Sequence, residues 1–406
     1  MDTQAIMKTY ANLAVRVGVN LQRGQYLMIQ AKLEHVPLVR ALTEAAYEAG
    51  ARYVGVVYYD DHVRRAMIEH AGDEELSWTP PHLLAAGKYL DEVGGAKIAV
   101  VGDAEPKLMS DLDPARVGKA RMVELSNLSM SQINRRAVNW TIVACPNSGW
   151  AEAALGTPDV DALWDAVARA TRLYDEDPVA SWWAQVQRLS ERASAVNKHE
   201  FDAVHFSGPG TDLTIGLHDD GRWVSGDFST ATGIRHVPNL PTEEVFTTPD
   251  YRRVDGTVAA TRPLQLSAEG VTVEDLKVTF EGGRAVEVTA SAGGEVVEAQ
   301  MAVDAGAARL GEVALVDEDS AVGRTEMTFN STLFDENATS HIAYGAAYSF
   351  CVEGAAGLSK DELLARGIND SSVHTDFMIG GPGVDITGIT KSGDRVMIIA
   401  DNVWQL

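Results

Sequence analysis

Cysteine and basic residues are scarce in this sequence of 406 residues. The two cysteines, Cys145 and Cys351, are too few for a disulfide framework and form no Cys-x-x-Cys pair of the kind found in structural zinc sites. Lys and Arg number 34 against 58 Asp and Glu, so the net charge is −24. Because this charge repels phosphate groups, we expect neither nucleic acid nor an anionic membrane as a partner. The composition favours a reducing compartment and cationic or metal partners.

Long apolar runs are missing as well. No stretch approaches the roughly 18 consecutive apolar residues of a membrane helix, and residues 1–8 lack the pattern of a signal peptide. We therefore expect a cytoplasmic protein. The apolar fraction of 45% and the charged fraction of 23% are ordinary for a globular chain. At about 150 residues per domain, the length predicts two or three domains, of which we expect two.

The first half of the chain alternates helical patterns with short apolar runs. These helical and strand-like segments follow one another over residues 6–17, 26–30, 38–49, 53–59, 97–101 and 141–144. Gly50 stands where the C-cap of the second helical segment is expected. The alternation predicts an α/β domain with a mostly parallel sheet and helices on both faces.

The pattern changes in the second half. Residues 159–197 are helical and rich in Ala, Arg, Trp and Glu, whereas the later apolar runs are short and separated by Gly, Asp and Asn. Such runs are typical of antiparallel sheet, and Glu281-Gly-Gly-Arg284 predicts a hairpin turn. We therefore predict an N-terminal α/β domain over residues 1–198 and an α+β C-terminal domain with largely antiparallel sheet over residues 199–406.

Several familiar motifs are absent. No Gly-x-Gly-x-x-Gly, Gly-x4-Gly-Lys-Ser/Thr or Gly-x-Ser-x-Gly sequence occurs, which leaves nucleotide binding and a serine nucleophile without support. His199 and His205 are six residues apart and would lie on different faces of a helix, so we do not expect them to bind metal. Cys145 has no basic residue close in sequence, which favours a buried thiol over a nucleophile.

Candidate catalytic groups gather in the last part of the chain, where their surroundings are otherwise apolar or tightly turned. Glu243 and Glu244 follow Thr242, which is typical of a helix N-terminus, whereas in a strand only one of the two glutamates would face a given site. Glu312 opens an apolar run. Because a buried carboxylate without a partner is too costly, Glu312 must end a strand at solvent, pair with a cation or bind metal.

Two further segments contain histidines. A helix beginning near His341 would place Tyr344 and Tyr348 on the same face as that imidazole, although core packing also explains such a stripe. His374 and Asp376 would share one face of a strand and reach one point in space, although a plain surface pair is the alternative. Glu336 stands five residues before His341 and is a further candidate. With one glutamate of the pair 243 and 244, the two imidazoles and four carboxylates match the needs of two divalent ions with a shared water.

These segments resemble the signature blocks of a known family. The blocks are Pro238-Asn-Leu-Pro-Thr-Glu-Glu-Val-Phe-Thr, Leu310-Gly-Glu-Val-Ala-Leu-Val, Thr332-Leu-Phe-Asp-Glu-Asn-Ala-x-x-His-Ile-Ala and His374-x-Asp-Phe-Met-Ile-Gly. They are similar to those of the aminopeptidase T/aminopeptidase S family of dinuclear metallo-aminopeptidases, and the similarity extends over nearly the whole chain. The resemblance implies two domains, with the metals in the second, and homodimers that enclose a large cavity.

The resemblance also implies the residues of the site. The implied metal ligands are Glu244, Glu312, Glu336, His341, His374 and Asp376. Tyr348 is implied as a catalytic hydrogen-bond donor. Zinc, cobalt and manganese all suit this mixed set of nitrogen and oxygen ligands, whereas the two imidazoles argue against calcium.

We therefore expect an aminopeptidase that removes N-terminal residues from peptides with a free N-terminus, through a water bridging two divalent ions. Glu312 would move the proton to the leaving amine. One alternative is a dinuclear hydrolase of another amide or ester, such as a phosphoesterase, with Arg235, Arg252 and Arg253 as candidate phosphate clamps. Another is a non-catalytic acidic binding protein that uses metal only to hold its second domain together.

Overall fold

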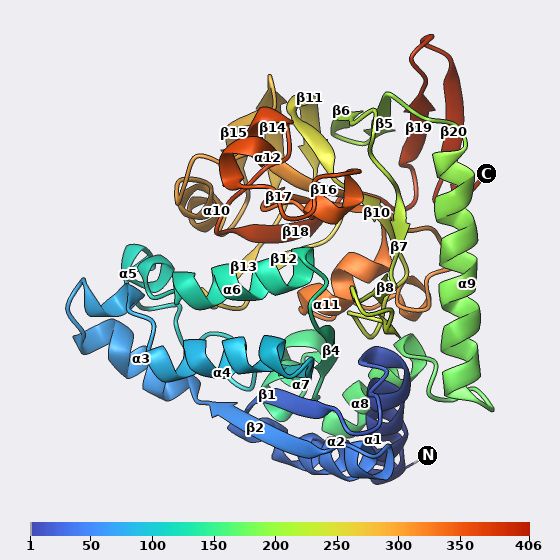
Figure 1. Ribbon diagram of the computed structural model, residues 1–406. Helices are drawn as coiled ribbons and strands as arrows, with labels where there is room; N and C mark the ends of the chain where they lie inside the picture. Colours follow the sequence, from blue (N-terminus) through green and yellow to red (C-terminus); the bar gives the residue numbers. More distant parts are fainter. Residues whose placement is uncertain (1) are drawn as a thin grey trace. The chain divides into compact units, whose positions relative to one another are not determined.

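The computed structural model describes residues 2–406, and the chain divides into two units (Figure 1). The first unit contains the residues up to Val186, together with Gly226–Thr242 and Ser267–Gly270. The second contains Gln187–Ser225, Glu243–Leu266 and Val271–Leu406. The domain limits 1–198 and 199–406 stay a prediction from the sequence. Within residues 2–406, no helix has the length and apolar character needed to cross a membrane.

A four-stranded parallel sheet forms the centre of the first unit. Its order is β2-β1-β3-β4, and each neighbouring pair is parallel. The strands are β1 (Tyr26–Lys32), β2 (Tyr53–Tyr59), β3 (Ala96–Val101) and β4 (Asn139–Ala144). The predicted parallel sheet is confirmed, and its strands coincide with the apolar runs of the sequence.

Helices connect and cover these strands, with α4 and α6 on one side of the sheet and α1 and α2 on the other (Figure 1). Met28 of β1 packs with Leu90 of α4. The side chain of Asp60 accepts hydrogen bonds from two backbone N–H groups at the start of α3. Gly50, with φ of +92°, follows the end of α2, as the sequence predicts. The helices are α1 (Thr3–Leu13), α2 (Val36–Glu48), α3 (Asp61–His70), α4 (Pro81–Glu92), α5 (Pro114–Lys119), α6 (Val123–Asn134), α7 (Ser148–Leu155) and α8 (Val160–Ala170), and α9 (Pro178–Asn197) begins in this unit and ends in the second.

Two antiparallel sheets form most of the second unit. The larger has the order β15-β14-β11-β6-β5-β19-β20-β21, and the smaller has the order β18-β17-β16-β10-β7. The larger sheet consists of β5 (Ala203–Gly208), β6 (Thr211–Leu217), β11 (Pro249–Ala259), β14 (Lys277–Glu281), β15 (Arg284–Thr289), β19 (Asp385–Ile389), β20 (Arg395–Ala400) and β21 (Val403–Trp404). The smaller sheet consists of β7 (Val224–Ser225), β10 (Val245–Thr247), β16 (Leu310–Leu315), β17 (His341–Gly345) and β18 (His374–Met378). The predicted antiparallel character is confirmed, and Glu281 pairs with Arg284 at the predicted hairpin.

Shorter elements complete the chain. Two small hairpins pair β12 (Leu264–Leu266) with β13 (Val271–Val273) and β8 (Phe228–Ser229) with β9 (Arg235–His236). The helices of the second half are α10 (Gly294–Met301), α11 (Thr332–Asp335) and α12 (Lys360–Ala365), and single 3-10 turns lie at Glu336–Ala338 and Ser349–Cys351.

A large hydrophobic core lies in the second unit, and one face of the smaller sheet contributes to it. The contributing side chains alternate along the strands and include Val313, Ile342, Tyr344 and Phe377. This alternation excludes the helix considered near His341 in the sequence analysis. Residues 341–345 form a strand and not the start of a helix, so Tyr344 points into the core, on the face opposite to His341. The opposite face of this sheet, which includes His341, does not pack into that core and can present polar side chains.

Candidate metal centre

The polar face of the smaller sheet collects its functional groups from neighbouring strands. Directly opposed residues of antiparallel strands point to the same face. Glu312 of β16 is opposite Ala343 of β17, and Ala343 is opposite Asp376 of β18. His374, two residues before Asp376, shares that face, as the sequence predicts. The small side chain of Ala343 leaves room between the acids on either side of it.

The same register places the remaining ligand candidates of the sheet. His341 lies two residues before Ala343 and therefore on its face, and Ala314 is opposite both His341 and Phe246 of β10. Glu244 lies directly before β10 and two residues from Phe246. A single face thus gathers groups from segments that are far apart in the sequence, from Glu244 to Asp376.

The distances show two overlapping groups. Candidate ligand atoms of Glu244, Glu312 and His341 lie within 4.8 Å of one another, and so do those of Glu312, His374 and Asp376. His341 Nε2 is 2.9 Å from Glu244 Oε2, and His374 Nε2 is 3.3 Å from Glu312 Oε2. Glu312 belongs to both groups. All five residues are buried or nearly so.

Glu336, the sixth predicted ligand, comes from the 3-10 turn after α11. It lies outside both three-residue groups but is buried beside them. Burial raises the pKa of Glu336 well above its usual value, and the charges of Asp376, Glu244 and Glu312 raise it further. Its carboxylate therefore shares the electrostatic environment of the other ligand candidates.

Glu243 and Glu244 have opposite surroundings. Glu243 Oε1 accepts a hydrogen bond from the backbone N–H of Ala321 at 3.2 Å, and Glu243 Oε2 lies 3.6 Å from the guanidinium of Arg188. Glu244 instead faces His341. Adjacent residues of an extended segment point to opposite sides, so one glutamate joins the cluster while the other pairs with an arginine.

The cluster contains more acid than base. In the described chain, the ion-pair partners of Glu244, Glu312 and Asp376 are His341 and His374, and neither Lys nor Arg takes part. Burial raises the pKa of Glu312 to about 7, with further contributions from the nearby acids. Burial opposes the charge of His341, but Glu244 and its neighbours raise the pKa of this imidazole to about 10. In the protein alone, protons on the imidazoles and on the buried glutamates thus balance these acids, and bound cations could replace those protons.

The donor set fits divalent metal. His374 Nδ1 lies 2.8 Å from the carbonyl oxygen of Ala346 and His341 Nδ1 lies 3.3 Å from that of Thr339, so an N–H donated there leaves each Nε2 lone pair facing the carboxylates. Glu244 Oε2 is buried and is in contact with the Nε2 atom of His341. Buried carboxylates and oriented imidazoles of this kind are ligands for zinc, cobalt or manganese.

Tyr348 lies just beyond β17 at the edge of the cluster. Its ring centroid is 5.2 Å from that of His374 and 5.7 Å from that of Phe246, and Phe350 follows at 5.5 Å. Burial and then the charges of nearby acids, first Glu312, raise the pKa of Tyr348 well above its usual value, which keeps the phenol protonated as a donor. Phe246 and Phe350 were missed in the sequence, although period-two spacing from Glu244 would have placed Phe246 on this face.

Residues considered for other roles are engaged elsewhere. Burial raises the pKa of the Cys145 thiol to about 12, in line with an inert buried cysteine. His205 lies on β5, where Nδ1 is 3.0 Å from the Thr214 hydroxyl, outside both groups of the cluster. The three arginines proposed as phosphate clamps each pair with an aspartate: Arg235 with Asp227, Arg252 with Asp250 and Arg253 with Asp202.

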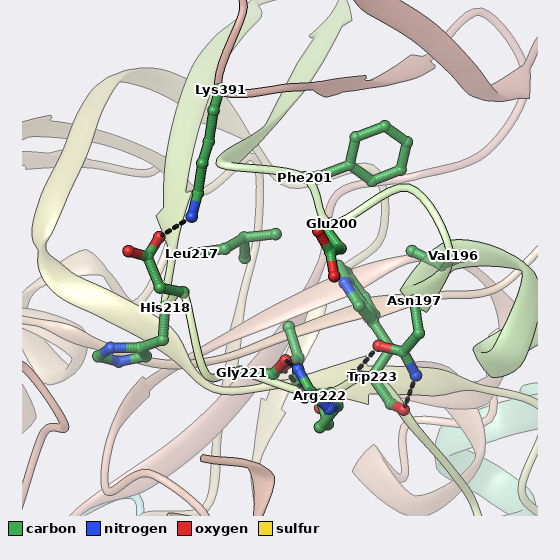
Figure 2. A pocket seen from close by; sticks show the side chains of 12 residues that line it. Val196, Asn197, Glu200, Phe201, Leu217, His218, Gly221, Arg222, Trp223 and Lys391 are labelled. Carbon is green, nitrogen blue, oxygen red and sulfur yellow. Dashed lines mark hydrogen bonds and ion pairs between the residues drawn. The ribbon is translucent and has the colours of Figure 1, made fainter. Parts of the chain in front are cut away.

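A hollow of about 270 Å³ also occurs in the second unit and shares no residue with the cluster. Figure 2 shows Lys391 on one side of it and Glu200 and Asn197 on the other. Lys391 is 2.9 Å from Asp219, and Asn197 exchanges two hydrogen bonds with the backbone of Trp223. The lining contains two acids, Glu200 and Asp219, and two basic residues, Arg222 and Lys391, so the hollow has no excess of acidic groups comparable with that of the cluster.

The sequence and the fold are similar to those of known proteins. The profile of the thermophilic metalloprotease family (M29) matches residues 3–404. The sequence is 44% identical over 400 residues to Aminopeptidase T of Thermus aquaticus, with 97% of each chain covered. It is 37% identical over 404 residues to Aminopeptidase AmpS of Bacillus subtilis, with 98% of each chain covered. The solved structure of wild-type AmpT from Thermus thermophilus is similar with a TM-score of 0.88 and 39% identity, and covers 99% of each chain.

Proposed function

The chain belongs to the thermophilic metalloprotease family M29 and is a peptide hydrolase, and on that premise we propose that it removes N-terminal residues from peptides with two divalent ions. One observation carries the proposal. Glu312 is shared by two groups of candidate ligands on one face of a buried sheet. A shared carboxylate between two such groups is the arrangement expected of a two-ion hydrolase.

The proposed ligands divide between two positions. Glu244 and His341 would hold one ion, His374 and Asp376 the other, and Glu312 would contribute to both. Glu336 supplies the sixth group. Ions bound there would acidify a water molecule and polarise the scissile carbonyl group. Zinc, cobalt and manganese each suit the ligand set.

Residues of the chain provide the proton transfers. Glu312, which belongs to both groups of ligand candidates, would accept a proton from the attacking water and pass it to the leaving amine. The Tyr348 hydroxyl, kept protonated, would donate a hydrogen bond to the carbonyl oxygen as that oxygen gains negative charge. Acidic side chains of the cluster would bind the free α-ammonium group, which places the first peptide bond at the site. The homodimer and the cytoplasmic location stay predictions.

The function is tested by measuring metal content per chain beside hydrolysis of a panel of aminoacyl-anilides. We expect two ions per active chain, loss of activity after chelation, and recovery when zinc, cobalt or manganese is restored to the folded metal-free protein. Less than one ion per active chain would contradict the two-ion mechanism. Hydrolysis of a phosphate ester in place of the anilides would favour the dinuclear phosphoesterase, and a folded, metal-loaded protein without hydrolytic activity would favour a structural metal.

A further inference from the structure

Asn337 connects two of the segments that carry candidate ligands. This side chain is fully buried in the 3-10 turn that contains Glu336. Its Oδ1 accepts a hydrogen bond from the backbone N–H of Glu243 at 2.7 Å. Its Nδ2 donates to Glu336 Oε1 at 3.3 Å and to the carbonyl oxygen of Leu333 at 3.0 Å. One amide therefore bonds the carboxylate of Glu336 and the backbone next to Glu244.

A third segment closes the connection. The Ser320 hydroxyl donates a hydrogen bond to the carbonyl oxygen of Asn337 at 2.6 Å, and the N–H of Ala321 donates to Glu243 Oε1 at 3.2 Å. The hydrogen bonds thus run from residue 243 to 337, from 337 to 320, and from 321 back to 243. Such a closed network fixes segments that are far apart in the sequence.

The choice of an amide has a chemical reason. The backbone N–H of Glu243 needs an acceptor, and the carboxylate of Glu336 needs a donor that adds no charge. Asn supplies both from one short side chain. Asp would supply only the acceptor and would place a second carboxylate against Glu336, while Ala would leave buried groups without partners.

We propose that Asn337 is a positioning residue that sets Glu336 against Glu244 and thereby fixes the shape of the ion site to which both contribute. The proposal rests on the proposed function. Residues that hold metal ligands through hydrogen bonds typically change metal affinity by about 10- to 100-fold when they are replaced. Asn337 is thus required for ion affinity, and its effect on folding is secondary.

Asn369 provides a matched control. It is also a buried asparagine, and its Nδ2 donates to three backbone carbonyl oxygens, those of Gly306, Arg309 and Gly345. None of the six ligand candidates bonds to its side chain in the hydrogen bonds of the described chain. Replacing Asn369 therefore removes a comparable set of buried hydrogen bonds without touching a ligand.

The experiment compares Asn337→Asp with Asn369→Asp in the full-length protein. Ion affinity and stoichiometry are measured with zinc against a competing chelator, and thermal unfolding is measured on the metal-free forms. We expect both variants to lower the unfolding temperature, and only Asn337→Asp to weaken one of the two ions, by about 10- to 100-fold. Ser320→Ala, which removes one bond of the network, should weaken the same ion by less and serves where Asn337→Asp does not fold.

Two results would overturn the positioning role. Both ions bind Asn337→Asp as tightly as the wild type, or Asn369→Asp loses affinity to the same extent, which would indicate general loosening of the second unit. Failure of the proposed function is seen separately, because the wild-type protein itself would then not bind two ions.

Discussion

The negative charge of acidic side chains is balanced differently in two regions of this protein. In the first unit, the Lys32 ammonium at the carboxyl end of β1 forms ion pairs with Asp61, at 2.6 Å, and with Asp103. In the second unit, Glu244, Glu312 and Asp376 form ion pairs with two imidazoles and with no ammonium or guanidinium group of the described chain. The first group contains its own cation, whereas the second contains no lysine or arginine and has a ligand set that fits added cations.

The pKa shifts follow this difference. Burial opposes the charge of Lys32, but the two aspartates outweigh it and raise the pKa of the ammonium. Burial of Glu312 is only partly offset by His374, so the pKa of Glu312 rises to about 7. A lysine in the middle makes an acidic group a structural ion pair, and the lack of one makes it a candidate ion site.

The largest expected difference between the two regions is in catalysis, because only substitutions in the second region should lower turnover directly. Tyr348→Phe keeps the ring beside Phe246 but removes the hydroxyl that would donate to the developing oxyanion. We expect kcat to fall by about 10²- to 10³-fold, with two ions still bound. Tyr344→Phe is the control, because its hydroxyl donates to Gln300 on the core face of the same strand. Equal turnover in Tyr348→Phe and wild type would remove Tyr348 from the mechanism.

The adjacent glutamates allow a test inside the second region. Glu244→Gln should weaken ion binding by at least about 10- to 100-fold, because it removes the negative charge of a proposed ligand that lies beside His341. Glu243→Gln weakens the contact with Arg188 but keeps an amide oxygen that can accept from the Ala321 N–H, so it should keep both ions. Chelator competition on the two variants measures the difference. The reverse order of affinities would show that the wrong glutamate has been assigned.

In the first region, removing the internal cation should cost stability without affecting activity. Lys32→Met keeps the apolar stem and leaves Asp61 and Asp103 facing each other. We expect the free energy of unfolding to fall by about 3 kcal/mol, near the lower end for a broken buried ion pair because the lysine is partly exposed. Lys32→Arg keeps the charge and should lose less. Denaturant unfolding checks both, and an unchanged stability in Lys32→Met would make the first group an ordinary surface cluster.

The sequence was sufficient where the structure depends on local pattern. His374 and Asp376 share a face because residues two apart in any strand do so. The apolar runs of the first half were long enough to indicate their strands, and the short runs of the second half indicated antiparallel sheet.

What the sequence could not settle depends on pairing between distant segments. The orientation of Glu243 and Glu244 is set by the register of β10 against β16, which lies about 65 residues further on. The helix considered near His341 does not form, because β17 is held between β16 and β18 and those partners outweigh a local helical spacing. The contact from Asn337 to the backbone of Glu243, 94 residues away, leaves no local signal at all.

The smallest expected effect comes from comparing two buried imidazoles. His341, among acids, has a pKa raised to about 10, whereas burial lowers the pKa of His236 in the first unit to about 4. Since the unfolded chain binds this proton near pH 6.5, folding favours neutral His236, and stability is present above pH 6.5 and lost as pH falls toward 4. At pH 5 the loss amounts to about 2 kcal/mol. His236→Phe should remove this part of the pH dependence, which is measured as the difference between wild-type and variant unfolding free energies at pH 7.5 and pH 5. If the unfolding free energies of the two proteins changed equally with pH, His236 would be protonated in the folded state at pH 5. The histidines of the two regions would then not have pKa values shifted in opposite directions.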